Sequence, residues 1–129
     1  MAKECSNQNK PQNCCPVERT LVLIGGKYKA LILWNLVGKT LRFSDLQREV
    51  TAATPRMLTK QLRELEEDGL LSRKVYAVVP PKVEYSLTEL GESLRPILES
   101  MYIWGTAFLR KQGRTPCCSM KELPKVQEH

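Results

Sequence analysis

Two adjacent thiols, Cys14 and Cys15, stand directly before Pro16 and an amphipathic run, and they are the first candidates for chemistry. Proline suits the first turn of a helix, so a helix is predicted to begin at Pro16 with Cys15 as its N-cap. The partial positive charge of a helix N-terminus, together with Arg19 one turn on, favours a thiolate over a thiol. We interpret Cys15, with Cys14 beside it, as a candidate sensor of electrophiles or oxidants, and the alternative is a functionally silent exposed thiol.

The distribution of cysteines allows a second interpretation. All five lie in the two tails, because Cys5 precedes the first pair and Cys117-Cys118 forms another pair near the end. Four thiolates would suit zinc, copper(I) or arsenite, so a thiolate metal sensor is an alternative function. Adjacent cysteines lack the usual C-x-x-C ligand spacing, and we therefore predict no metal site and no cofactor.

Residues for catalysis are scarce. The sole histidine is the terminal residue, His129. The sequence contains neither a Gly-rich phosphate loop nor paired carboxylates in a familiar setting. We expect that the protein is not an enzyme.

A cationic helix face is the second candidate for chemistry. At about 100° per residue, Arg56, Thr59, Lys60 and Arg63 fall on one side of a helix predicted from Pro55 to Asp68, opposite three leucines. The segment from Lys27 to Arg63 holds eight basic and two acidic residues, an excess equal to the net charge of +6 of the whole chain. A concentrated positive field suits the phosphates of double-stranded DNA, and a helix of this kind fits the major groove.

Other residues are predicted to contact DNA around this helix. Arg42, Ser44 and Thr54 lie near the starts of capped helices, whose amide ends can hold phosphates. Arg73, Lys74 and Lys82 lie in a predicted hairpin, although their direction depends on a strand register that the sequence does not fix. A protein-interaction module is a further alternative, and it would predict a neutral or apolar helix face instead.

The helices that position these residues have clear local signals. The first helix is predicted to end at Gly25-Gly26, and a nearly all-apolar second helix should cover about 27–37. In "RFSDLQREV", Ser44 is predicted as the N-cap and Gln47 as its capping-box partner. In the next helix Thr54 caps, Pro55 takes the first position and Gly69 terminates. A short helix, a tight connection and a second helix form a helix-turn-helix pattern.

A β-hairpin and a last helix complete the predicted fold. Alternation from Leu71 to Tyr76 and from Lys82 to Leu87, around Pro80-Pro81, predicts two paired strands. Thr88 is predicted to cap one long helix, bent at Pro96, that ends near Gly113. Its apolar residues form a heptad seam, which we interpret as a homodimer interface together with the first helix. The predicted interface residues are Leu21, Leu94, Ile97, Met101, Trp104 and Phe108.

The order of these elements predicts a mainly α fold with a small β-hairpin wing, a winged helix-turn-helix. The segments "CPVERTLVLIGGKYKALIL", "LRFSDLQREV" and "MLTKQLRELEEDGLLSRKVYAVVPPKVEYSLTELG" closely resemble the HxlR family of bacterial transcription regulators, relatives of the MarR type. The resemblance implies a homodimer, joined through its terminal helices, that binds pseudo-palindromic operator DNA, in our interpretation as a repressor. Family members often control genes for detoxifying electrophiles, and some sense them through one N-terminal cysteine, which matches Cys15. Cys14 and the Cys117-Cys118 pair are not part of that motif.

The ends of the chain are predicted to be tails. We expect a disordered segment at 1–14, a DNA-binding domain with its dimerisation helix at 15–112, and a polar tail at 113–129. The polar N-terminus has no apolar signal segment, and no run approaches the roughly 18 apolar residues that a membrane span needs. A cytoplasmic protein without a membrane partner is expected.

Overall fold

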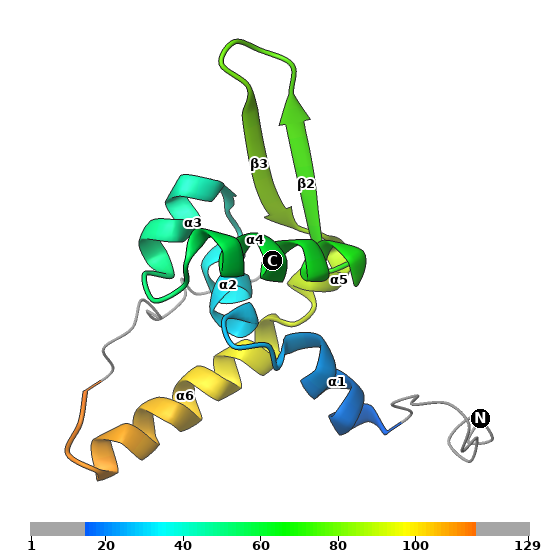
Figure 1. Ribbon diagram of the computed structural model, residues 1–129. Helices are drawn as coiled ribbons and strands as arrows, with labels where there is room; N and C mark the ends of the chain where they lie inside the picture. Colours follow the sequence, from blue (N-terminus) through cyan, green and yellow to red (C-terminus); the bar gives the residue numbers. More distant parts are fainter. Residues whose placement is uncertain (1–14, 116–129) are drawn as a thin grey trace, which may run out of the picture.

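A computed structural model describes residues 15–115 of the chain, and its helices and strands follow the order of a winged helix-turn-helix (Figure 1). The elements are α1 (Pro16–Ile24), α2 (Lys29–Leu36), β1 (Thr40–Arg42), α3 (Phe43–Glu49), α4 (Pro55–Glu67), β2 (Leu71–Tyr76), β3 (Lys82–Leu87), α5 (Glu89–Glu92) and α6 (Arg95–Lys111). This arrangement confirms the predicted mainly α fold with a β-hairpin wing. None of the helices within 15–115 is long and apolar enough to cross a membrane.

The helix-turn-helix consists of α3, a short connection and α4. Thr54 caps α4 as predicted, because its hydroxyl accepts a hydrogen bond from the Met57 amide at 3.1 Å. Pro55 takes the first helical position. Gly69 follows the helix with a φ of +81°, a left-handed conformation that favours glycine. Because these signals are local, the ends of α4 could be predicted from the sequence.

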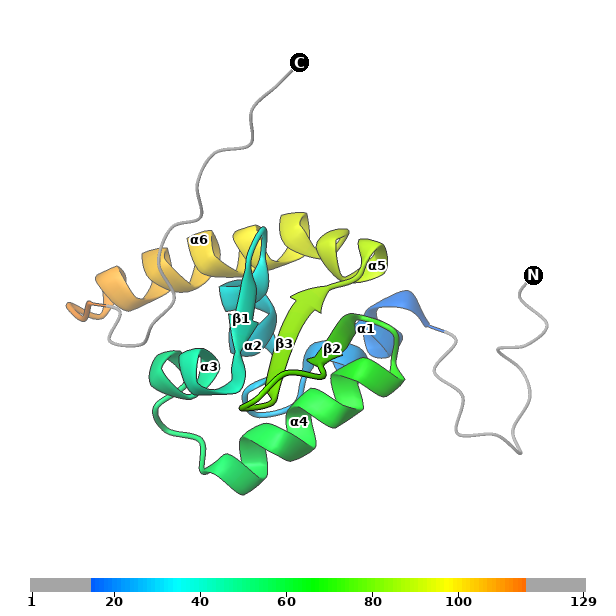
Figure 2. The same ribbon diagram turned by 90° about the horizontal axis from the view of Figure 1, so that it is seen from above.

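The sheet contains a third strand that was not predicted from the sequence. Its antiparallel order is β1-β3-β2, so β3 is the central strand and β1 joins the predicted hairpin as a third strand. The hairpin rises above the helical body (Figure 1), and the view from above shows α4 and α6 on opposite sides of the sheet (Figure 2). β1 has only three residues and pairs with residues more than forty positions later, so no local pattern reveals it.

One hydrophobic core joins the helices to the base of the sheet. Its most deeply buried side chains come from α2, α3, α4, the start of β2 and α6, and they are chiefly Ile32, Leu33, Leu36, Leu46, Leu58, Leu62, Leu65, Leu71 and Leu98. At the base of the wing, α5 packs closely on the chain between α4 and β2. A Cβ atom added at Gly91 would lie 2.1 Å from the Leu70 carbonyl oxygen, so this contact requires glycine.

Two predicted details at helix starts are wrong. Ser44 does not cap α3, because the helix begins at Phe43 and the carboxylate of Asp45 accepts a hydrogen bond from the Arg42 amide at 3.0 Å. Thr88 does cap a helix, but that helix is the short α5. The helix is interrupted at Ser93 and Leu94, and α6 begins after them. Pro96 therefore lies in the first turn of a new helix, where proline disrupts no helical hydrogen bond.

Candidate nucleic-acid interface

The exposed face of α4 presents the predicted cationic residues together. Arg56, Thr59, Lys60 and Arg63 are exposed, whereas the leucines on the opposite side of the helix are buried in the core. With Pro55, these four residues line a shallow surface hollow of about 400 Å³. The leucines therefore fix the rotation of the helix, and that rotation directs the cations to solvent.

A hydrogen-bonded junction between α1 and α2 holds α4 in place, and no pattern in the sequence predicts it. The Tyr28 amide donates to Oε1 of Gln61 at 3.2 Å, and the Tyr28 hydroxyl donates to the Ala52 carbonyl at 3.1 Å. Tyr28 therefore contacts both α4 and the turn that precedes it. Gly26 allows this close approach, because a Cβ atom there would lie 2.9 Å from Oε1 of Gln61, whereas in the sequence Gly26 indicates only the end of the first helix.

Lys29 stabilises the packing of α2 on α4 and does not add to the charge of the surface. It is buried, and its Nζ forms an ion pair with Oε1 of Glu64 at 2.9 Å. The hydrogen bond from Lys29 lowers the pKa of Glu64 below its usual range. The predicted positive excess of the segment from Lys27 to Arg63 includes Lys29, so the excess that faces solvent is smaller than the sequence indicated.

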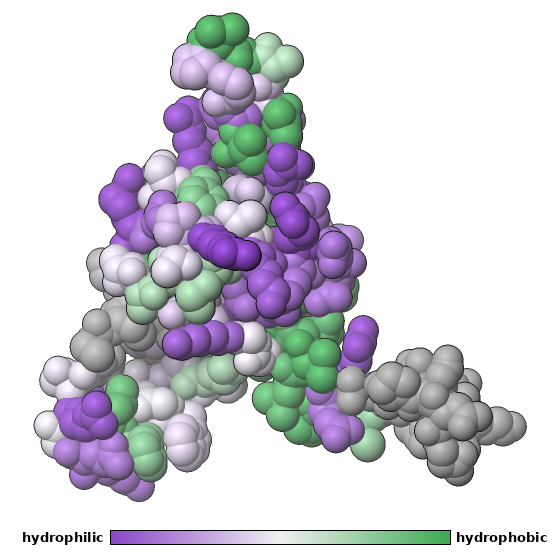
Figure 3. Space-filling model, viewed as in Figure 1, coloured by the Kyte–Doolittle hydropathy of each residue, from purple (hydrophilic) through white to green (hydrophobic). Residues whose placement is uncertain are grey.

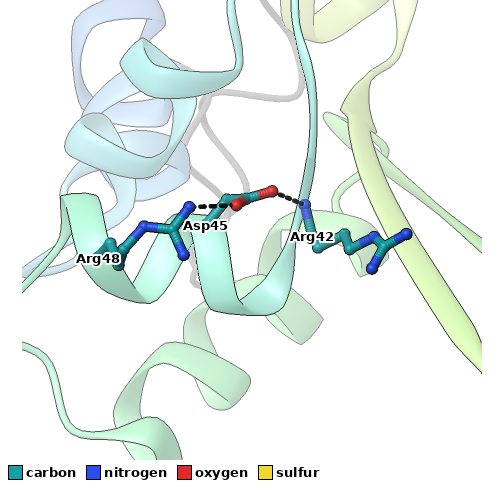
Figure 4. Close-up of polar contacts among 3 residues, drawn as sticks. All are labelled: Arg42, Asp45 and Arg48. Atoms are coloured by element: carbon teal, nitrogen blue, oxygen red, sulfur yellow. Dashed lines mark hydrogen bonds and ion pairs between the residues drawn. The ribbon is translucent and has the colours of Figure 1, made fainter.

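The start of α3 carries a small polar network (Figure 4). Asp45 accepts from the Arg42 amide and forms an ion pair with the Arg48 guanidinium, and these two hydrogen bonds hold the pKa of its carboxyl below the ordinary value. The side chain of Arg42 points away from this network. Arg42 and Ser44 are both exposed, and Asp45 does not pair with the Arg42 guanidinium in this network.

The strand register separates the three predicted wing cations. Arg73 pairs with Tyr85 across the hairpin, while its neighbour Lys74 pairs with Glu84, so the side chains of Arg73 and Lys74 lie on opposite faces. Arg73 and Tyr85 line a hollow of about 260 Å³ together with residues of α4, namely Thr59, Leu62, Arg63 and Glu66. Arg73 is therefore next to the cationic face of α4.

Lys74 and Lys82 gather around an aromatic ring on the other face of the wing. Their Nζ atoms lie 5.1 and 4.6 Å from the centre of the Tyr76 ring, which is the distance of a cation–π contact. Nζ of Lys82 is also 3.6 Å from Glu84, and that carboxylate accepts a hydrogen bond from the Tyr76 hydroxyl. The two lysines thus share one organised cluster, apart from Arg73.

An apolar surface formed by α1 and α6 contains most of the predicted dimer residues. Leu21, Ile97 and Met101 line a hollow of about 360 Å³ between the two helices. Ile97, Met101 and Trp104 line a neighbouring hollow of about 700 Å³, and the Trp104 ring stacks on Phe108 with centres 5.3 Å apart. Leu94 does not belong to this surface, because the break before α6 turns it into the core, where it is only 8% exposed.

Cys15 occupies the N-cap position of α1. Its side chain is exposed, and its carbonyl accepts a hydrogen bond from the Arg19 amide at 2.9 Å. Cys14 and the other three cysteines lie outside the described residues. Within residues 15–115, no group of three or more His, Cys, Asp or Glu side chains is placed to hold a metal ion.

Known proteins with similar sequences are transcriptional regulators. The family model for the HxlR-like helix-turn-helix matches residues 23–113. The HTH-type transcriptional regulator YdeP of Bacillus subtilis is 51% identical over 94 residues, which cover 73% of each chain.

Solved structures show the same fold. The redox regulator HypR in its oxidised form is 52% identical, with a TM-score of 0.69 over 72% of this chain and 96% of that one. The reduced form of the transcriptional regulator YodB from B. subtilis is 29% identical, with a TM-score of 0.65 over 77% and 98% of the two chains. A diamide-treated structure of YodB also matches, with a TM-score of 0.62 over 81% of this chain and all of that one.

Proposed function

The chain belongs to the HxlR-like helix-turn-helix family of transcriptional regulators, and on this premise we propose that it is a homodimeric repressor that inserts α4 into the major groove of operator DNA. The observation that supports the proposal best is the exposed row of Arg56, Thr59, Lys60 and Arg63, held outward by buried leucines. A dimer bound at a promoter would repress by occupying the site that the polymerase needs.

The contacts fall into two classes. Arg56 and Arg63 suit guanine edges in the major groove, and Thr59 and Lys60 suit mixed contacts to bases and phosphates. Arg73 lies beside them and would contact the adjacent backbone. Arg42, Ser44 and Thr54, at or next to the N-termini of α3 and α4, would position the phosphates without reading sequence. Lys74 and Lys82 would add charge from the other face of the wing.

The apolar surface of α1 and α6 is proposed as the dimer interface. Leu21, Ile97, Met101, Trp104 and Phe108 are exposed in the single chain, and they form one continuous surface because Ile97 and Met101 line both hollows. Covering such a surface with a second copy removes apolar area from water. Two copies of α4 about 34 Å apart would then meet successive turns of the major groove.

A thiol sensor at the start of α1 is the regulatory part of the proposal. Cys15 is exposed and lies beside the proposed interface. The next two residues, Pro16 and Val17, line the hollow between α1 and α6 that forms part of this interface. Relatives of the same fold include a redox regulator in two oxidation states and a regulator treated with diamide. Modification of Cys15, with Cys14 beside it, would alter the seating of α1 against the partner and so the spacing of the two copies of α4.

The DNA-binding function is tested by a salt titration on random duplex DNA. If the cationic face contacts phosphates, the logarithm of the binding constant should fall linearly with the logarithm of salt concentration. Mapping of bound genomic DNA in cells then identifies the operator. Absence of binding to any duplex at low salt would overturn the proposal.

The sensor is tested separately with Cys15→Ser. Diamide, a two-electron oxidant, should join Cys15 to a second thiol of the dimer in a disulfide, and this should lower the operator affinity of the wild-type protein and leave that of the variant unchanged. Cys5→Ser is the matched control, because it removes a thiol ten residues before Cys15 and keeps the Cys14-Cys15 pair, so the diamide response should remain. An equal diamide response of the wild type and Cys15→Ser would exclude Cys15 as the sensor and would leave DNA binding standing.

A further inference from the structure

The hollow between α4 and the base of the wing contains a carboxylate that does not suit a DNA phosphate. Glu66 lines this hollow of about 260 Å³ together with Arg63 and Arg73. Hydrophilic side chains gather over α4 and at the base of the hairpin (Figure 3). The two guanidinium groups would attract a phosphate, whereas the carboxylate beside them would repel it. Contact with the DNA backbone therefore explains the arginines of this hollow and leaves Glu66 unexplained.

The charged groups around the hollow do not neutralise one another. Arg63 and Glu66 are one turn apart on α4, where an ion pair could form. Within residues 15–115, however, the ion pairs of the structure involve other residues, and Arg63, Glu66 and Arg73 are all exposed. The hollow thus offers two cations and one anion to a ligand from outside.

The floor of the hollow is apolar and aromatic. The residues that α4 contributes follow the spacing i, i+3, i+4, i+7 and surround one patch of the helix surface, namely Thr59, Leu62, Arg63 and Glu66. Leu62 is only 2% exposed, and it closes this patch from below. Tyr85 is partly buried against the core and lines the hollow from the side of the sheet. A ligand here would contact a short apolar floor between charged walls.

The pattern of charges indicates the class of ligand. Two guanidinium groups suit two carboxylates, because the planar fork of arginine matches a carboxylate. Glu66 suits a cationic group, and since Glu66 is the neighbour of Arg63 on the helix, this cation must lie close to one of the carboxylates. An α-amino acid has this arrangement, because its ammonium and carboxylate groups share one carbon atom. A second carboxylate at the end of a short side chain, as in aspartate and glutamate, would reach Arg73.

We propose that this hollow binds an acidic α-amino acid and that the ligand competes with DNA. Glu66 would hold the ammonium group, Arg63 the α-carboxylate and Arg73 the side-chain carboxylate. The methylene groups of the ligand would lie over Leu62. Both arginines are among the residues proposed to contact DNA, so the ligand and the duplex would exclude each other. This competition rests on the proposed DNA-binding function, whereas binding of the amino acid does not.

The ligand is tested by titrating the full chain with L-glutamate and L-aspartate while the backbone amide shifts are recorded by NMR. Saturable shifts should centre on the residues that line the hollow. Glutarate lacks the ammonium group, and L-norvaline lacks the side-chain carboxylate. Each should bind about tenfold more weakly than glutamate at the same pH and ionic strength, because each loses one charge-assisted hydrogen bond. Equal binding of all three compounds, or no saturable shift at the hollow with either acidic amino acid, would overturn the proposal.

The variant Glu66→Gln tests which group holds the ammonium. The side chain is exposed, so the variant should fold as the wild type does. It should lose the preference for glutamate over glutarate, because an amide neither attracts an ammonium group as a carboxylate does nor repels the second carboxylate. Glu67→Gln is the matched control and should keep the preference, since Glu67 is exposed, adjacent and outside the hollow. An equal preference in the two variants would overturn the role of Glu66.

Competition is measured by the fluorescence anisotropy of a labelled duplex. At constant ionic strength, glutamate should lower the duplex affinity of the wild type and of Glu67→Gln, and norvaline should need about a tenfold higher concentration for the same effect. Glutamate that binds in the hollow without lowering duplex affinity would overturn the competition. Failure of the wild type to bind any duplex would instead overturn the proposed function and leave the amino-acid site standing.

Discussion

Arg63 lies where the helix that would read DNA and the base of the wing converge. It lines both the hollow on the exposed face of α4 and the hollow shared with Arg73. A single guanidinium in this position can reach a base edge or the adjacent phosphate, and both kinds of contact lose energy when the side chain is truncated. Its backbone position is fixed by Leu62 and Leu65, the buried leucines on either side of it.

Arg63→Ala is therefore predicted to weaken operator binding by about 1 to 3 kcal/mol. The protein should unfold at the same temperature as the wild type, because the side chain is exposed and makes no core contact. Fluorescence anisotropy with the mapped operator measures the affinity. Arg110→Ala removes the same charge from the last turn of α6 and should leave binding nearly unchanged. Equal losses in both variants would mean that total charge matters and the position of Arg63 does not.

At the scale of elements, the junction between α1 and α2 connects the sensor helix to the helix that would read DNA. Tyr28 bonds to Gln61 and Ala52, and Lys29 pairs with Glu64, so this short segment contacts α4 twice and its preceding turn once. A movement of α1 would be transmitted to α4 through these hydrogen bonds and this ion pair. The junction thus gives the proposed thiol chemistry a physical route to the DNA-binding face.

The Lys29–Glu64 pair gives this junction a pH dependence. The pKa of Glu64 in the folded protein is lowered from its ordinary value of 4.5, so the stabilisation is complete above that value and is lost as pH falls through the lowered pKa. Glu64→Gln leaves the buried Lys29 without a charged partner and should lower the free energy of unfolding at neutral pH. The difference from the wild type should shrink on acidification, because the protonated carboxyl resembles the amide. Urea denaturation across pH 3 to 7 checks this, and a pH-independent difference would contradict it.

On the scale of the whole molecule, the wing and the apolar surface of α1 and α6 lie at different ends (Figure 1). One end has cations and would meet DNA, and the other has exposed large apolar side chains, of which Trp104 is 68% exposed. A second copy can therefore be added at one end without covering the other. This separation makes subunit association and DNA binding independently testable.

Trp104→Glu is predicted to convert the proposed dimer to a monomer, because it places a charge in a surface that association would remove from water. Sedimentation should show half the mass, and operator affinity should fall strongly, since each monomer has one α4. Ile103→Glu puts the same charge on an exposed part of α6 outside both hollows and should remain dimeric. A wild-type protein that sediments as a monomer at micromolar concentration would contradict the proposed interface.

The sequence predicted features whose causes are local. Thr54, Pro55 and Gly69 mark the ends of α4 through bonds and dihedral angles within a few residues, and the structure confirms them. β1, the faces of Arg73 and Lys74, and the Tyr28 bonds depend on partners far along the chain. Leu94 followed the heptad pattern, yet the break before α6 turned it inward. Periodicity identifies an apolar face without telling which partner will cover it.

The tight contact between Gly91 and the Leu70 carbonyl has a consequence for how such regulators diverge. A larger side chain at that position would push against the Leu70 carbonyl and displace the base of the hairpin. Val78 and Val79, at the end of the hairpin, are exposed and have no such constraint. Exchange of residues at the extremity of the wing therefore leaves its base undisturbed, whereas a substitution of Gly91 would change the way in which the wing leaves the body.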